Sequence, residues 1–251
     1  MLLAAVLAVL LAAAEAALER PAYFKPCSRN DPDLDACALK NGIEAVPFLL
    51  KGDRKYKIPV VDPLKITEIR IDDANKGSSA TGLNIFLRDL TVYGLDKVQL
   101  KKVHFDLQKK EVEIVLAIPS LRLKSQYEID GKILVLPIKG KGDGNINMTD
   151  VDITYWLKYD LVTKPDGLEY MKAGDSKLVH KTKNMHMYLD NLFNGDKTLG
   201  ENTNSFLNEN WEVLNTEIGP FIAQAIGEAI KQIIANCMDL IPYNVLFPEE
   251  V

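Results

Sequence analysis

The residues of this chain that could perform chemistry are few and are poorly spaced for it. Its three histidines are His104, His180 and His186, and imidazole nitrogens serve as zinc ligands and general bases. His180 and His186 share one parity of a strand-like run, opposite to that of Met185 and Met187. Because no further ligand stands at a suitable spacing, the pattern predicts exposed strand histidines and no metal site.

Residues 143–147 begin like a calcium-binding loop. Such a loop needs a glycine at its sixth position and a bidentate glutamate at its twelfth, but Met148 and Thr154 stand there. The chain also lacks the Gly-x-Ser-x-Gly motif of a hydrolase nucleophile. We therefore expect no catalytic residue and no cofactor, so the protein is predicted not to be an enzyme. A secreted esterase is the enzyme-class alternative.

The three cysteines divide into a pair and a single residue. Cys27 and Cys37 have nine residues between them, and in an oxidising compartment they are the natural disulfide pair. Cys237 lies in an apolar helical stripe, which favours a buried free thiol over an intermolecular bridge. Asn147 begins the chain's only glycosylation sequon, Asn-Met-Thr. Its occupancy depends on whether an adjoining strand hides it.

The first sixteen residues resemble a secretory signal peptide. Residues 2–14 are almost wholly Leu, Ala and Val, and residues 14–16 have the small-x-small form of a cleavage site. No other apolar run approaches the length of a membrane span. We expect a secreted, extracellular protein in which residues 17–251 form a single ligand-binding domain.

Composition restricts the class of partner. The net charge of −5 argues against nucleic acid, which calls for a clustered basic surface. Residues 97–110 are rich in lysine but interleaved with apolar residues, as in a solvated strand face. A membrane-docking patch is the alternative for this stretch. We expect a monomer without stable membrane insertion.

The middle of the chain, residues 59–189, predicts a strongly curved antiparallel sheet. Strand-like runs alternate apolar and polar residues, which indicates one wet face. The apolar parity slips within four runs, and each slip requires a bulge, which bends and twists a strand. The slips fall at residues 66–69, 87–90, 100–103 and 148–151.

The C-terminal part of the chain predicts a long helix. Apolar residues recur every three or four positions from Leu199 to Ile241, with a kink expected at Gly219-Pro220. Thr198 and Glu201 form a capping box that would start this helix. Its apolar arc is wide enough to lie in the hollow of the sheet. A shorter helix is expected over residues 34–50, with Pro47 limiting how far it extends. The predicted class is α+β, a curved antiparallel sheet wrapped around a long C-terminal helix.

The stretch of residues 191–211, NLFNGDKTLGENTNSFLNENW, resembles the signature segment of the takeout and juvenile hormone-binding protein family of insects. Cys27 and Cys37 resemble that family's N-terminal disulfide pair, and residues 58–64, IPVVDPL, resemble its segment before the first strand. The resemblance implies a secreted, non-enzymatic carrier of small hydrophobic ligands, related to the tubular lipid-binding proteins. The second disulfide typical of haemolymph hormone binders is missing, which favours a takeout-like member.

A carrier needs an apolar cavity with a few polar groups. We predict that the inward strand faces and the last helix supply it, and that Tyr127 or Tyr155 donates a hydrogen bond to the ligand or to nearby backbone. The alternative is a lipid-exchange protein that docks transiently on membranes. The predicted ligand-binding residues are Val112, Ile114, Leu116, Ile118, Tyr127, Leu134, Leu136, Tyr155, Trp211, Leu214, Ile218 and Ile222.

Overall fold

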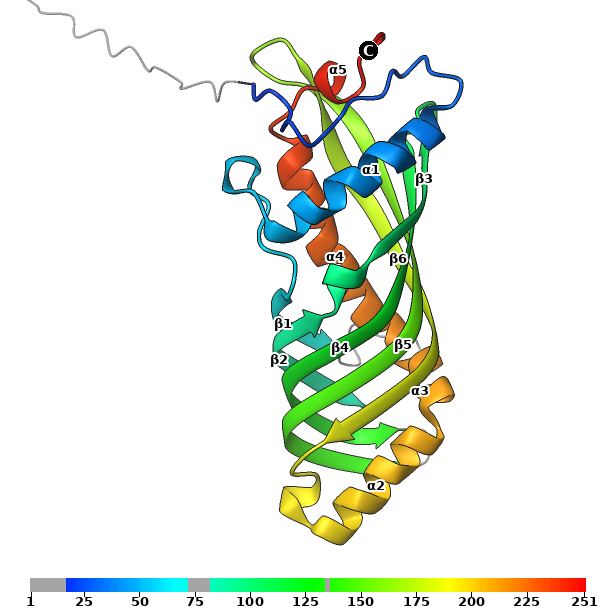
Figure 1. The fold of residues 1–251 in the computed structure, drawn as a ribbon. Helices are drawn as coiled ribbons and strands as arrows, with labels where there is room; N and C mark the ends of the chain where they lie inside the picture. The colour runs from blue at the N-terminus through cyan, green and yellow to red at the C-terminus, as the bar shows by residue number, and fades with distance from the viewer. Residues whose placement is uncertain (1–16, 72–81, 134–135) are drawn as a thin grey trace, which may run out of the picture.

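The described part of the chain folds as a curved sheet around a helix (Figure 1). The computed structural model describes residues 17–71, 82–133 and 136–251. Within these residues, six antiparallel strands pair in the order β1-β2-β4-β5-β6, and β3 pairs with β4. The strands are β1 (Leu64–Ile71), β2 (Asn84–Tyr93), β3 (Gln99–Asp106), β4 (Glu111–Ile133), β5 (Leu136–Thr163) and β6 (Glu169–Leu189).

The sheet bends along a line that crosses its three longest strands. Pro119 of β4, Asp150 of β5 and Lys183 of β6 face one another there without regular pairing, and register is kept on both sides. Asp150 has a φ of 50°. The residues facing inward change parity across the line, from Ile118 to Leu121 in β4. The bend thus keeps apolar side chains on the concave face throughout, as the slip at residues 148–151 predicted.

Strand pairing is also interrupted at the other three predicted slips. Register shifts occur between Arg88 and Thr91 of β2 and between Leu100 and Lys102 of β3. The slip at residues 66–69 causes no register shift, because the paired residues of β2 slip at the same place. Bulges such as those in β2 and β3 bend a strand and increase its twist.

The C-terminal helical region contains the predicted long helix and breaks next to Gly219-Pro220 as expected, but a second break at Asn210 was not predicted. The pieces are α2 (Lys197–Glu209), α3 (Trp211–Glu217), α4 (Gly219–Met238) and α5 (Tyr243–Leu246). Asn210 and Ile218 leave the ideal helical conformation, and the Asn210 side chain donates to the Phe206 carbonyl, which competes with helix continuation. The helix α4 runs along the hollow of the sheet (Figure 1).

The start of α2 also differs from the capping box that was expected at Thr198. Asp196 is the N-cap, and its carboxylate accepts a hydrogen bond from the amide of Leu199 at 3.0 Å. The turn before it contains Asn194 and Gly195 at positive φ, as the sequence predicted. A carboxylate also interacts favourably with the positive end of the helix dipole, which explains the earlier start.

The helix α1 (Leu34–Lys51) lies beside β3 in the upper part of the view in Figure 1. It covers the predicted residues 34–50 with Pro47 inside it, and it ends at Gly52, whose φ is 75°. A proline removes one helical hydrogen bond but does not always end a helix. Asp35 fixes α1 to β3 by accepting from His104 at 2.6 Å and from the amide of Phe105 at 3.0 Å.

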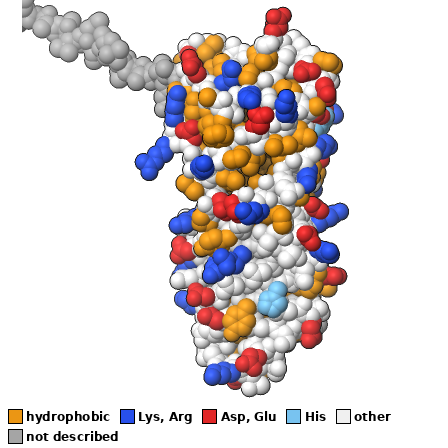
Figure 2. Space-filling model, viewed as in Figure 1, with side chains coloured by type: hydrophobic (Ala, Val, Ile, Leu, Met, Phe, Trp, Pro, Cys, Tyr) orange, Lys and Arg blue, Asp and Glu red, His pale blue; other side chains and the backbone are white. Residues whose placement is uncertain are grey.

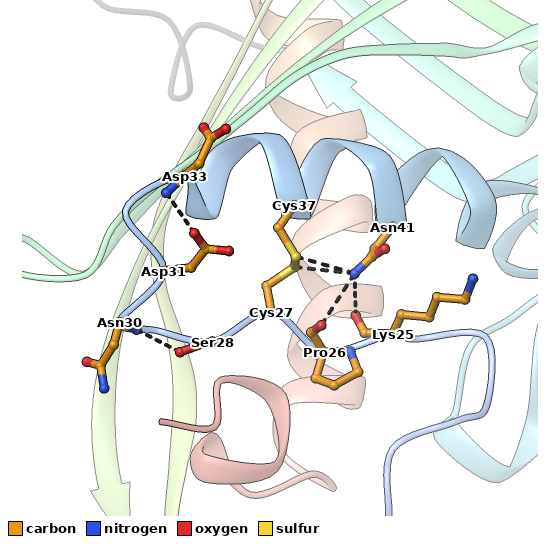
Figure 3. Close-up of a disulfide and its surroundings, with 9 residues drawn as sticks. All are labelled: Lys25, Pro26, Cys27, Ser28, Asn30, Asp31, Asp33, Cys37 and Asn41. Atoms are coloured by element: carbon orange, nitrogen blue, oxygen red, sulfur yellow. Dashed lines mark hydrogen bonds between the residues drawn. A yellow bond between two sulfur atoms is a disulfide. The ribbon is translucent and has the colours of Figure 1, made fainter. Parts of the chain in front are cut away.

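The disulfide between Cys27 and Cys37 joins the N-terminal segment to α1, as predicted (Figure 3). Asn41, one turn after Cys37, donates to the backbone carbonyls of Lys25 and Pro26. Cys237 is a buried free thiol near the end of α4, and burial raises its pKa to about 11. The short 3-10 helices are η1 (Arg54–Tyr56), η2 (Leu95–Lys97) and η3 (Phe193–Gly195).

Two asparagines of α2 close the free edge of β6. Asn208 accepts from the amide of Met187 and donates to its carbonyl, both at 2.8 Å. Asn204 makes the same pair of bonds to Leu189, both at 2.9 Å. The side chains of Met187 and Leu189 meanwhile point into the hollow. This segment of the family-like signature therefore satisfies the backbone of an edge strand.

Candidate ligand-binding cavity

An apolar cavity of about 400 Å³ lies between the concave face of the sheet and α4. Aliphatic side chains of β1, β2, β4, β5, β6 and α4 supply most of its wall, and α1 contributes Val46, Leu49 and Leu50. Within the described residues, the polar side chains in the wall are Ser125, Tyr127, Tyr155, His180 and Asn215. A wall of this kind suits a hydrophobic molecule with few polar atoms.

The structure brings eight of the twelve predicted ligand-binding residues to the cavity wall. They are Ile114, Leu116, Ile118, Tyr127, Tyr155, Leu214, Ile218 and Ile222. Val112 is buried instead in a neighbouring cluster with Leu157 and Tyr159. Trp211 lines a groove on the outside, because the break at Asn210 turns α3 relative to α2. Leu136 is half-buried away from the cavity, and Leu134 lies outside the described residues.

The hydroxyl of Tyr127 is engaged within the fold. It donates to the backbone carbonyl of Asp190 at 2.5 Å. Burial raises the pKa of Tyr127 above its ordinary value, and the nearby charge of Asp190 adds to the effect. Tyr127 thus uses its one proton on the backbone, which was one of the two outcomes considered from the sequence.

The hydroxyl of Tyr155 is in a different position. The residue is 2% exposed, and its hydroxyl has no hydrogen-bond partner among the described residues. Burial raises the pKa of Tyr155, and the nearby side chain of Ser176 opposes that effect. A buried phenol without a partner is costly, so Tyr155 offers an unused donor in the wall of the cavity.

His180 also belongs to the wall, so the prediction of an exposed strand histidine was wrong for this residue. The bend at Lys183 changes the parity of β6, which places His180 on the concave face and leaves His186 exposed. The ring Nε2 of His180 lies 2.8 Å from the Oδ1 of Asn215 in α3. Because an amide oxygen only accepts, Nε2 carries the proton and donates.

Sequence reasoning missed most of the wall supplied by β2, β6 and α1. The apolar alternation of Ile85 and Leu87 and the inward parity of Met185 and Met187 were available signals. The polar pair of His180 and Asn215 was missed because its detection requires the bend in β6.

Asn147, the predicted glycosylation site, is exposed in the middle of β5 between Arg122 and His186 of the adjacent strands. Among the described residues, no three His, Cys, Asp or Glu side chains gather as a metal site would require. No helix within residues 17–71, 82–133 and 136–251 is both long and apolar enough to cross a membrane.

A curved sheet that encloses a helix and a long apolar cavity defines a class of small-molecule binding proteins. The model of the family described as haemolymph juvenile hormone binding protein matches residues 4–248, so the chain belongs to that family. Members of this family bind small hydrophobic ligands and are not known as enzymes.

Two kinds of relative agree with this assignment. The chain is 28% identical to the circadian clock-controlled protein daywake of Drosophila melanogaster over 235 residues, covering 92% of this chain and 89% of that protein. The daywake protein of Drosophila yakuba matches equally well. The crystal structure of Epiphyas postvittana Takeout 1 aligns with a TM-score of 0.77 and 25% identity, covering 89% of this chain and 99% of the other.

Proposed function

We propose that this protein is a secreted carrier that holds a small hydrophobic ligand in the cavity between the sheet and α4. The wall of that cavity is almost wholly aliphatic, which supports this function. The ligand is a juvenile hormone-like terpenoid, a fatty acyl compound or a similar lipid. Residues 17–251 form the one ligand-binding domain, which acts as a monomer and without catalysis.

Burial of the ligand supplies the affinity. About 400 Å² of apolar ligand surface removed from water contributes roughly 10 kcal/mol. The costs of association reduce this to an affinity in the micromolar to nanomolar range. Tyr155 donates its free proton to an ester, epoxide or acid oxygen of the ligand, which orients it.

Secretion is supported by two observations. The disulfide between Cys27 and Cys37 is of a kind that persists in oxidising compartments. Residues 1–16, which lie outside the described residues, have the composition of a signal peptide. Sequencing the N-terminus of the protein from its native fluid tests removal of this segment, and the same material shows by mass whether Asn147 carries a glycan.

A cavity-filling substitution tests the carrier function. Ile222→Trp places a larger side chain in the wall of the cavity, whereas Val213→Trp places it on the exposed surface of α3. We expect the first to abolish displacement of an apolar fluorescent probe by terpenoid or fatty acyl ligands, and the second to preserve it. Equal displacement in both variants would contradict the proposal, as would turnover of a juvenile hormone-like ester.

The exposed apolar residues of α1 favour a second candidate function, lipid exchange at membranes. Ile43 and Phe48 of α1 and Val60 of the segment before β1 are each more than half exposed, and hydrophobic side chains gather across the upper part of the face in Figure 2. The exposed Lys101 of β3 lies in the lysine-rich stretch of residues 97–110. Binding to anionic vesicles that falls with added salt would support this function over that of a free carrier.

A further inference from the structure

A groove of about 550 Å³ lies on the outside of the molecule, where β6 meets α3 and the start of α4. We call it the outer groove, and it is lined by residues 178–183 of β6, by Trp211, Glu212, Asn215 and Thr216 of α3, and by Pro220 and Ala223 of α4. Four of its residues also line the apolar cavity, namely Leu178, His180, Asn215 and Ala223. At this point the wall between cavity and solvent is therefore one side chain thick.

The hydrogen bond between His180 and Asn215 closes that thin wall. These two polar residues lie in the shared wall together with the apolar residues Leu178 and Ala223. Gly219 lets α4 start close behind the pair, because a Cβ there would stand 3.1 Å from both the Asn215 Oδ1 and the His180 Cε1. Because of this close approach, the side chains of His180 and Asn215 border both the apolar cavity and the outer groove.

The pair keeps free hydrogen-bonding groups. Since the Nε2–H of His180 donates to Asn215, the amide Nδ2 of Asn215 retains two N–H groups with no partner among the described residues. The Nδ1 of His180 likewise has no described partner. Two lysines of β6 border the outer groove, and Lys181 makes no salt bridge with a described residue. Glu212 is the acidic residue of the groove, and Lys183 lies 3.8 Å from the carboxylate of Asp150.

We propose that His180 and Asn215 form a head-group subsite for a carboxylate at the end of an apolar chain. The chain lies in the cavity, and the carboxylate lies in the side wall, where it accepts from the Asn215 amide. Hydrogen bonds from a neutral donor to a charged acceptor are among the stronger ones in proteins. This inference rests on the proposed carrier function and assigns the ligand to the long-chain carboxylic acids.

A comparison of palmitic acid with its methyl ester tests the subsite. Both compounds present the same chain, and only the acid has a charged head. Displacement of an apolar fluorescent probe is measured for the unaltered chain and for Asn215→Asp and His180→Leu. His186→Leu is the matched control, because His186 is an exposed histidine on the same strand.

We expect Asn215→Asp, which keeps the side-chain volume and adds a negative charge, to weaken the binding of the acid by about 10- to 100-fold. Binding of the methyl ester should change little, and His186→Leu should alter neither. If His180→Leu does not fold, Asn215→Asp alone decides the test. Equal changes for acid and ester, or no change for either, would overturn the subsite and leave the carrier function standing. Failure of both compounds to displace the probe from the unaltered chain would overturn the carrier function and the subsite together.

Discussion

The free edge of β6 is closed in two different ways, by α2 at one end and by α3 and α4 further up the strand. At α2, Asn204 and Asn208 bond to the backbone of Leu189 and Met187. Further up, His180 bonds to Asn215 through side chains alone. The first closure takes the place of a neighbouring strand. The second places polar side chains, which can also bond to a ligand, in the cavity wall. The comparison separates residues that hold the fold from residues that can meet a ligand.

Geometry explains why asparagines at this spacing suit the first closure. Four residues of a helix rise about 6 Å, and two residues of a strand span about 6.6 Å. Asn204 and Asn208 therefore lie in step with Leu189 and Met187. An amide side chain carries one donor and one acceptor group, as a backbone peptide does, so each asparagine satisfies one edge residue completely.

The largest effect is expected from Asn204→Ala, which breaks the first closure. Asn204 is buried, so its substitution leaves the amide and the carbonyl of Leu189 without partners at a site that water reaches poorly. We expect the free energy of unfolding to fall by about 2–4 kcal/mol, measured by urea denaturation. Asn202→Ala is the control, since Asn202 is exposed on the same helix. Equal losses in the two variants would refute the distinction between the edge-closing asparagine and its neighbour.

A smaller energy is expected from the second closure. A double-mutant cycle with His180→Ala and Asn215→Ala should give a coupling of about 0.5–1.5 kcal/mol in unfolding, because the bond is neutral and half-exposed. His186→Ala paired with Asn215→Ala should give none. A coupling as large as the loss at Asn204 would mean that both closures are structural and would remove the contrast.

The smallest effect distinguishes two glycines. Gly200→Ala in α2 should stabilise the fold by about 0.5 kcal/mol, because its nearest contact would be an ordinary 3.8 Å to Leu192. Gly219→Ala should give no such gain, since the new Cβ would press on Asn215 and His180 at 3.1 Å. Thermal unfolding of both variants measures the difference. A gain at Gly219 equal to that at Gly200 would show that the second closure is loosely packed.

The family and the fold could be predicted from the sequence because they depend on local patterns. Parity slips marked the bends of the sheet, and the Asn-rich stretch of residues 191–211 marked the turn from sheet to helix. The break at Ile218 was predicted from Gly219-Pro220, but the break at Asn210 was not, because apolar periodicity continues through it. Periodicity records which face is buried and does not record the direction of the helix axis.

The site was less predictable than the fold. The residues of β4 and α4 that line the cavity followed from parity. His180 was assigned to the wrong face because the bend at Lys183 lies opposite Asp150, and no apolar residue of β6 marks it locally. Val112 and Trp211 had the right periodicity but lie beyond the ends of the cavity or outside it. Position along a curved strand cannot be derived from alternation alone.

Photochemical cross-linking tests the central claim most directly, namely that the apolar chain of a ligand occupies the cavity between the sheet and α4. The protein is irradiated with a 16-carbon acid that carries a diazirine near the end of its chain, and the adducts are located by peptide mass spectrometry. We expect adducts on cavity residues such as Ile118, Leu121 or Ile222. Adducts confined to the exposed Ile43 and Phe48 of α1 would contradict it.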